Sequence, residues 1–363
     1  MFRYFAEFSL SHWSALEMFN SITLRSLLAL LAAFIAALFF LPRLIRFLTA
    51  RRALEDMRKD SVLIERRHAD KKGTATMGGI GIALALLLGA FFFGDLREPL
   101  IWGGLAIFAG NALVGFADDL VKLKKWRAGG LNKKEKTAGL LLVAFLTAAI
   151  VATSADANTT KLLLPWTAPA AMGDLGGYYW LWFVLVLYAC ANAVNLTDGL
   201  DGLAAGCALS SVLAFAVFAY VAGNAVLSGY FAVPNIEGCG EMCVLLAGLV
   251  GALLGFLWFN AKPAQIFMGD TGALAIGGLL GYAALVSKQE IALLVAGGIF
   301  VLETLATVAQ IVGYRGWGKR LFLCAPLHHH LELRGWQENH IVIRFWMLNA
   351  LFAAAALGTL KMH

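Results

Sequence analysis

The sequence predicts an all-α integral membrane protein, because of its composition, its long apolar runs and the placement of its charges. Of the 363 residues, 60% are hydrophobic and only 14% are charged, whereas a soluble domain carries roughly 25% charged residues. A water-soluble core cannot hide that much apolar surface, so lipid must solvate part of it. The apolar runs are continuous and about 20 residues long, as in helices that cross a bilayer, and they do not alternate as β-barrel strands do.

About ten transmembrane helices are expected, in a single domain that covers residues 1–363. The apolar runs lie near residues 22–48, 77–93, 100–117, 137–153, 178–194, 202–222, 241–259, 272–286, 291–313 and 341–360. Because ten is an even number, both termini are expected on the same side of the membrane.

Lys and Arg indicate the orientation of these helices. They number 20 in the connections near 49–76, 118–136, 195–201, 260–271 and 314–340, and three in the opposite connections. Since cytoplasmic loops carry the excess of positive charge, the first set is expected in the cytoplasm and both termini on the outer side. The net charge of +6 is then explained by the positively charged cytoplasmic connections. For this reason no nucleic acid is expected as a partner.

Five cysteines are scattered along the chain and form no disulfide framework. Cys239 and Cys243 could pair if their connection faces an oxidising compartment, and otherwise both stay reduced.

The stretch LVGFADDLVKLKK ends an apolar run with two adjacent acids, Asp118 and Asp119. A carboxylate inside a bilayer costs about 2.5–3.5 kcal/mol even on insertion scales, so acids there indicate function. Neighbouring side chains of a helix project about 100° apart, so one acid can face the bundle centre and the other an adjacent loop. Lys122 lies four residues after Asp118, within reach of an ion pair. The alternative interpretation is a solvated helix end.

The connection NLTDGLDGLAAG contains Asn195, Asp198 and Asp201 at a spacing of three residues. On a helical turn the three side chains would share one face. The interleaved glycines would let the backbone approach a ligand closely. Capping of a helix by Asp198 is the alternative, because Asp is a preferred N-cap residue.

Asp270 stands in MGDTG at the expected start of a span, with Asn260, Lys262 and Phe267 just before it. The N–H groups at a helix start favour anions such as phosphate. Alternatively, Asp270 caps its own helix.

Three consecutive histidines, His328, His329 and His330, occur in the last connection, APLHHHLELRGW. Consecutive side chains cannot all point one way and Cys324 stands alone, so no zinc site is expected. The imidazoles suit hydrogen bonding to phosphate oxygens, and a pH-sensitive loop is the alternative.

A polar stripe precedes the histidines in the ninth apolar run. Glu303, Thr307 and Gln310 recur at i, i+4 and i+7, so they should face the bundle interior and bond between helices rather than face lipid.

The acids are expected in one cytoplasmic layer together with Lys71, Lys72, Lys122 and Lys136. Carboxylates favour Mg²⁺, and Mg²⁺ with Lys and His is a means of handling pyrophosphate. The motif G-x-x-x-x-G-K-[ST] does not occur, which excludes a P-loop enzyme. A site at the membrane surface suits a lipid substrate. An ion transporter is the alternative from another class, although no inverted repeat is evident.

Five motifs span essentially the whole chain in order: HADKKGTATMGG, GFADDLVKLKK, NAVNLTDGLDGLA, NAKPAQIFMGDTG and APLHHHLELRGW. In these motifs the sequence resembles the bacterial phospho-N-acetylmuramoyl-pentapeptide transferases (translocase I, MraY), within the superfamily of polyprenyl-phosphate N-acetylhexosamine-1-phosphate transferases. The resemblance implies an inner-membrane enzyme with periplasmic termini. It would transfer phospho-N-acetylmuramoyl-pentapeptide from UDP-N-acetylmuramoyl-pentapeptide to undecaprenyl phosphate. Lipid I and UMP are the implied products, Mg²⁺ is the implied cofactor and a homodimer is the implied assembly.

The resemblance also implies roles for residues of this sequence. Catalytic positions are matched by Asp118, Asp119, Asp270 and His329, with Asp270 and Asp119 as Mg²⁺ ligands. Substrate-binding positions are matched by Lys71, Thr76, Lys122, Lys136, Asn195, Asp198, Asp201, Asn260, Phe267, Gly269, Gln310, His328 and His330. Ala75 stands where the family motif has proline, which loosens the turn.

Two alternatives stay open within this resemblance. A sister enzyme would transfer N-acetylglucosamine phosphate to a polyprenyl phosphate. The chemistry would be either in-line attack by the lipid phosphate or two steps through a phospho-aspartate.

Overall fold

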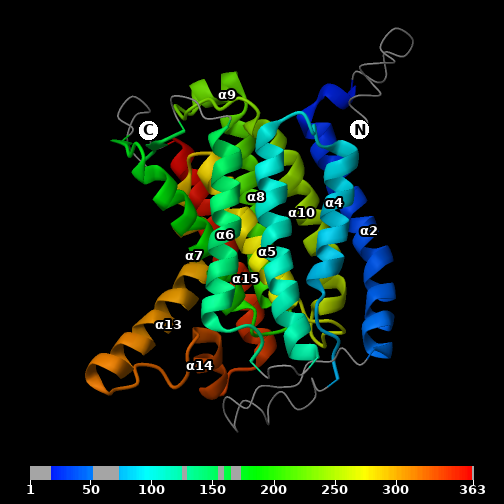
Figure 1. Ribbon diagram of the computed structural model, residues 1–363, viewed down its shortest axis with the longest axis vertical. Coiled ribbons are helices and arrows are strands. Elements are labelled where there is room, and N and C mark those ends of the chain that lie inside the picture. Colours follow the sequence, from blue (N-terminus) through cyan, green and yellow to red (C-terminus); the bar gives the residue numbers. More distant parts are fainter. Residues whose placement is uncertain (1–17, 52–72, 125–128, 154–158, 165–172, 362–363) are drawn as a thin grey trace.

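The structure is a computed structural model that describes residues 18–51, 73–124, 129–153, 159–164 and 173–361. Helices dominate it, with one pair of two-residue strands (Figure 1). The helices are α2 (Ile22–Ala50), α4 (Gly79–Phe93), α5 (Pro99–Leu123), α6 (Lys133–Ala152), α7 (Tyr178–Thr197), α8 (Leu203–Ala222), α9 (Ala225–Tyr230), α10 (Cys239–Asn260), α11 (Gly269–Val286), α12 (Glu290–Ala296), α13 (Gly298–Trp317), α14 (Leu327–Leu333) and α15 (Glu338–Gly358). A 3₁₀ turn, η4 (Thr359–Lys361), follows α15, and the antiparallel strands are β1 (Lys161–Leu162) and β2 (Gly173–Asp174).

Within the described residues, eight helices are long and apolar enough to cross a membrane, which confirms an all-helical, multi-pass membrane protein. The two remaining apolar runs, near 77–93 and 291–313, do not form a single long helix of transmembrane length. Helix α4 has only 15 residues. The run near 291–313, which we expected to be one span, is broken into α12 and α13 with a bend of 85°. The expected total of ten spans is therefore not established.

Helix α11 forms the centre of the bundle, and nearly all of its side chains are buried. It packs against α5 on one side and α7 on another, while α10 packs against α2 and α8. The outer helices expose large apolar side chains, among them Ile35, Leu142 and Leu185. Exposed apolar side chains on the outside of a bundle are what a lipid solvent requires.

The two ends of the bundle differ in content. Helix α2 begins and α15 ends at the same end of the molecule (Figure 1). The C-terminal end of α5 and the short helix α14 lie at the opposite end (Figure 1). The pairing of Cys239 with Cys243 is not formed, since both are free thiols.

Candidate active site

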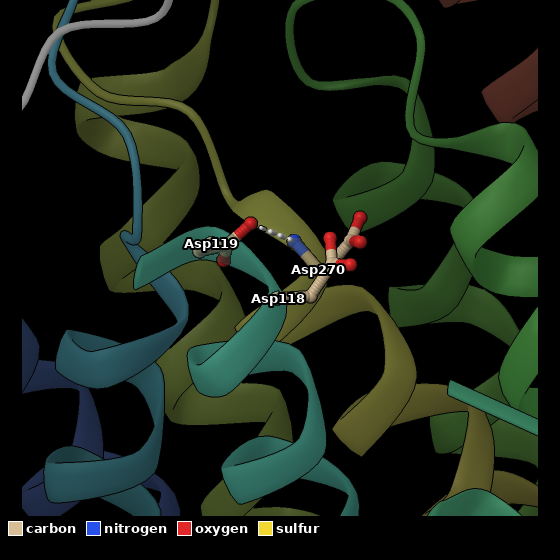
Figure 2. Close-up of side chains that lie close together, drawn as sticks. All are labelled: Asp118, Asp119 and Asp270. Carbon is tan, nitrogen blue, oxygen red and sulfur yellow. Dashed lines mark hydrogen bonds between the residues drawn. The ribbon is translucent and has the colours of Figure 1, made fainter. Parts of the chain in front are cut away.

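Three carboxylates meet at the end of the bundle that is opposite to the start of α2 and the end of α15. Asp118 and Asp119 come from the last turns of α5, and Asp270 comes from the first turn of α11 (Figure 2). Each offers one oxygen, and these oxygens lie within 4.8 Å of one another. Gly115 explains the approach: a Cβ at this position would overlap the backbone of Asp270. The missing side chain lets α5 lie directly on the start of α11.

Asp119 caps helix α11 from a different helix. Its Oδ2 accepts hydrogen bonds from the backbone N–H of Thr271 at 3.0 Å and from the Thr271 hydroxyl at 2.7 Å. Its Oδ1 accepts from the backbone N–H of Asp270 at 3.3 Å (Figure 2). Gly269 precedes them with φ +72°, a left-handed conformation that favours glycine. Because Asp119 does the capping, the Asp270 carboxylate is left available, and its expected alternative role as an N-cap is wrong.

Two lysines and an asparagine hold the Asp270 carboxylate. Lys122 and Lys136 lie 3.0 and 2.8 Å from its Oδ2. The amide of Asn195 donates to its Oδ1 at 2.8 Å and accepts from Lys136 at 3.3 Å. Asn195, in the last turn of α7, thereby joins the α7 end to the acid cluster.

Lys122 also pairs with the two acids of its own helix. It forms the expected i,i+4 ion pair with Asp118 and lies 3.7 Å from Asp119. Asp118 Oδ1 accepts from the backbone N–H of Leu131 at 2.7 Å, so this acid faces the loop before α6. Asp118 and Asp119 therefore face different neighbours, as the 100° separation on a helix predicts.

The donor set of this cluster fits a hard divalent cation. Asp118, Asp119 and Asp270 supply carboxylate oxygens at the separation that a shared ion needs. Against these three acids, Lys122 and Lys136 supply two positive charges, so a negative charge is left for a cation. The short contacts of both lysines to one oxygen also show that an incoming phosphate would find two ammonium groups beside the acids.

The MGDTG segment is held by the TATMGG segment before α4. Ala75 forms a parallel bridge with Ile266, and the Phe267 N–H donates to the Ala75 carbonyl at 2.8 Å. The Phe267 carbonyl in turn accepts from Gly78 at 2.8 Å. The carbonyl of Ala75 therefore helps to hold the segment that leads to Asp270. Thr76, in the same segment, is buried.

Asn260 ties together two loops beside the acids. Its Oδ1 accepts from the Gly202 N–H at 2.9 Å, and its Nδ2 donates to the Ile266 carbonyl at 2.8 Å. The side chain is buried and both ends of the amide have protein partners. The structure thus gives Asn260 a structural use, besides the nucleotide contact that the resemblance implies.

Replacing Asn260 by Ala is expected to destabilise the fold by about 1–3 kcal/mol, because two buried backbone groups lose their partners. Thermal unfolding in detergent measures this loss. Asn192→Ala is the matched control and should change the midpoint little, since among the described residues Asn192 bonds only to a carbonyl of its own helix. If Asn260→Ala keeps the midpoint and weakens only nucleotide binding, the structural use is wrong.

The expected common helical face of Asn195, Asp198 and Asp201 is wrong. Helix α7 ends at Thr197, and Asp198 is its C-cap residue rather than an N-cap. Asp201 lies in the following turn, where its carboxylate accepts from the Ala264 N–H at 3.2 Å. The end of α7 and the turn after it thus contact both the acid cluster, through Asn195, and the segment before MGDTG, through Asp201. The three side chains do not share one face.

The histidine run forms the short helix α14, and Glu303 of α13 caps it. The Glu303 carboxylate accepts from the N–H groups of Leu327 and His328, at 2.5 and 3.1 Å. Its Oε1 also lies 3.1 Å from His328 Nδ1. The stripe on α13 therefore does face protein, as expected, and its Glu303 bonds to α14. The Thr307 hydroxyl instead bonds to the Glu303 carbonyl of its own helix. This capping role of Glu303 could not be seen in the sequence, because the two helices are separated by a loop.

His328 reaches the turn after α7. Burial lowers the pKa of its imidazole below the ordinary value, so the ring is neutral at pH 7 and donates from Nδ1 to Glu303. Nε2 makes no hydrogen bond with any residue that the structure describes. A Cβ on Gly199 would overlap this nitrogen, so the imidazole lies against the turn that begins three residues after Asn195.

The other histidines and Gln310 are bound to nearby groups. His329 Nδ1 lies 2.8 Å from Glu332, and His330 Nδ1 accepts from the Leu323 N–H at 3.1 Å. Gln310 bonds to the backbone of Leu321 and Phe322 at 2.9–3.0 Å. The contacts of His330 and Gln310 hold the loop between α13 and α14, while that of His329 lies within α14.

The structure therefore brings most of the expected site residues to one end of the bundle. Direct contacts join Asp118, Asp119, Lys122, Lys136, Asn195, Gly269 and Asp270. The segments that contact this cluster or its neighbouring turns contain Thr76, Asp198, Asp201, Asn260, Phe267 and His328. Lys71 lies outside the described residues. Thr271 was missed, although its hydroxyl stands next to Asp270 in the MGDTG motif and was a visible candidate.

These features define a membrane-embedded transferase whose acid and lysine cluster lies at one end of the helical bundle. Residues 101–288 match the model of glycosyl transferase family 4, and this range contains all three acids. Over 97% of each chain, the protein is 44% identical to the phospho-N-acetylmuramoyl-pentapeptide-transferase of Desulfovibrio desulfuricans. It is 42% identical to the proteins of that name from Solidesulfovibrio magneticus, over 97% of each chain, and Granulibacter bethesdensis, over 96%. The chain belongs to the phospho-N-acetylmuramoyl-pentapeptide transferase family, which confirms the resemblance seen in the motifs.

Proposed function

We propose that this protein transfers phospho-N-acetylmuramoyl-pentapeptide from UDP-N-acetylmuramoyl-pentapeptide to undecaprenyl phosphate, with lipid I and UMP as products. The membership in the family supports this activity. The structural observation that supports it is a cluster at one end of an apolar bundle. This cluster consists of Asp118, Asp119, Asp270, Lys122 and Lys136. A lipid phosphate held in the membrane and a soluble nucleotide can meet there.

The proposed location is the inner membrane of a bacterium, with the acid cluster on the cytoplasmic side. The excess of Lys and Arg in the connections at this end supports this orientation. The soluble donor substrate would then reach the cluster from the cytoplasm.

Asp270 and Asp119 would hold Mg²⁺, whose charge would neutralise the diphosphate and stabilise departing UMP. Lys122 and Lys136 would take phosphate oxygens in place of the Asp270 carboxylate that they now contact. Asp118, which faces the loop before α6, would position the attacking lipid phosphate. His329 is proposed as a further catalytic group, and His328 and His330 as groups that bind the substrate.

The proposed step is in-line displacement. An oxygen of the lipid phosphate attacks the β-phosphorus of the UDP-sugar, and the bond from this phosphorus to the bridging oxygen breaks, so UMP leaves. A phosphate with a second pKa near 6 is largely ionised at pH 7, so the acids are needed more for position than for proton removal.

Purified protein with undecaprenyl phosphate and Mg²⁺ is expected to release UMP from UDP-N-acetylmuramoyl-pentapeptide. The same preparation with UDP-N-acetylglucosamine should release at most about a hundredth as much, because a site built for polar groups rejects a substrate that lacks them. Release of UMP from the N-acetylglucosamine donor alone would make the protein a sister enzyme. Ion flux without UMP release would make it a transporter.

Two finer parts of the proposal have their own tests. Labelled phosphate that stays on the protein when undecaprenyl phosphate is left out would favour a phospho-aspartate over in-line attack. A homodimer is proposed from the resemblance, and the mass of the detergent-solubilised protein measures it.

A further inference from the structure

The break between α12 and α13 removes hydrogen bonds that a continuous helix would make. The bend of 85° at Gly297 separates the Ala296 carbonyl from the helix that follows it. It also separates the Ile299 N–H from the helix that precedes it. Both groups are in an apolar environment, where a backbone group without a partner is costly. The chain therefore needs other partners at this point.

Asn349 of α15 supplies partners on both sides of the break. Its Oδ1 accepts from the Ile299 N–H at 3.2 Å, and its Nδ2 lies 3.4 Å from the Ala296 carbonyl. Ser211 of α8 adds a hydrogen bond from its hydroxyl to the same carbonyl at 2.7 Å. Asn349 Nδ2 lies 2.9 Å from this hydroxyl and 2.8 Å from the Cys207 carbonyl. Asn349 and Ser211 are both fully buried, so they make one polar node at the break.

The packing around the node fixes the direction in which α13 leaves. A Cβ on Gly298 would overlap the ring of Phe352, which lies one turn after Asn349 on α15. The first residue of α13 therefore lies flat against α15, and the helix then runs away from the bundle (Figure 1). A small change in the tilt of α13 at this point would displace the side chains that lie later on this helix.

The displaced side chains would include the one that holds the histidine helix. Glu303 lies one turn after Ile299 on α13, caps α14 and contacts His328. The imidazole of His328 then lies against Gly199, near the acid cluster. Contacts therefore lead without a gap from Asn349 to Ile299, Glu303 and His328.

We propose that Asn349, together with Ser211, is a positioning residue that sets the direction of α13 and thereby places α14 and its histidines at the active site. Its effect on catalysis rests on the proposed function, whereas its effect on α13 and α14 does not. The two effects are measured separately.

Hydrogen exchange in the detergent-solubilised full chain measures the positioning. Asn349→Leu keeps the branched shape of the side chain and removes its hydrogen bonds, so exchange should rise at residues 299–303 and 327–330 but stay unchanged at the start of α11. Ser211→Ala removes a single donor and should give a smaller rise at both 299–303 and 327–330. This second variant decides the test if Asn349→Leu does not fold. Thr147→Val is the control, because within the part of the chain that the structure describes this buried hydroxyl bonds only within its own helix. Unchanged exchange at 327–330 in both Asn349→Leu and Ser211→Ala overturns the proposal.

A double-mutant cycle measures the consequence for catalysis. Asn349→Leu and His328→Ala should each lower kcat/KM about tenfold, and the double variant should lose little more than either, because a displaced histidine has no further function to lose. Losses that multiply to roughly a hundredfold would show independent effects and overturn the catalytic part. If His328→Ala leaves the rate unchanged, the proposed role of His328 fails, while hydrogen exchange still tests the positioning.

Discussion

Asp270→Asn is expected to lower the rate of UMP release by roughly a thousandfold, because it removes a charge that must act on the transferring phosphate. The amide keeps the shape of the side chain, and its oxygen can still accept from Asn195 or from one lysine. The cap of α11 belongs to Asp119 and is untouched. The fold should therefore survive, and the loss should appear in kcat with a thermal midpoint close to that of the parent protein.

The measurement is UMP release against Mg²⁺ concentration, with undecaprenyl phosphate and the muramoyl donor both saturating. Addition of a chelator to the parent protein should abolish the rate, and excess Mg²⁺ should restore it, whereas Asp270→Asn should stay low at every Mg²⁺ concentration. Asp174→Asn is the control, since Asp174 is an exposed acid in β2. A parental rate in Asp270→Asn would show that the ion, if one is needed, is held elsewhere.

Much of the fold could be predicted because apolar runs report directly on membrane spans. Every expected run coincides with a helix or, near 291–313, with two helices. The meeting of Asp118, Asp119 and Asp270 was also predictable, since helix ends that share one side of a membrane are forced into one layer. Gly115 supplied the close contact, but a single glycine in an apolar run does not say which helix it will touch.

The sequence could not reveal contacts that join residues far apart in the chain. At the bend at Gly297 the backbone bonds to Asn349, about fifty positions later, and a hydropathy pattern contains no such information. The end of α7 at Thr197 likewise separated three residues whose spacing suggested one face. The extent of the domain and the roles implied for Lys71 and the other site residues stay predictions.

The adjacent acids Asp118 and Asp119 have different surroundings, and this difference has a consequence for mutagenesis. Asp119 both caps α11 and stands within reach of a shared cation. A loss of activity on replacing Asp119 by Ala would mix the two effects. Two substitutions separate them, because one keeps the hydrogen-bond acceptor and the other removes it.

Asp119→Asn retains an oxygen for the N–H and hydroxyl of Thr271 but has no charge for a cation. We expect a loss of about a hundredfold in UMP release with a nearly parental thermal midpoint. Asp119→Ala removes the cap as well, so it should lose activity and also about 1 kcal/mol of stability, up to about 2. Thermal unfolding and UMP release on the same preparations measure both. If the Asn variant keeps its activity while the Ala variant loses activity and stability together, Asp119 is only the cap of α11, and the cation belongs to Asp270 and Asp118.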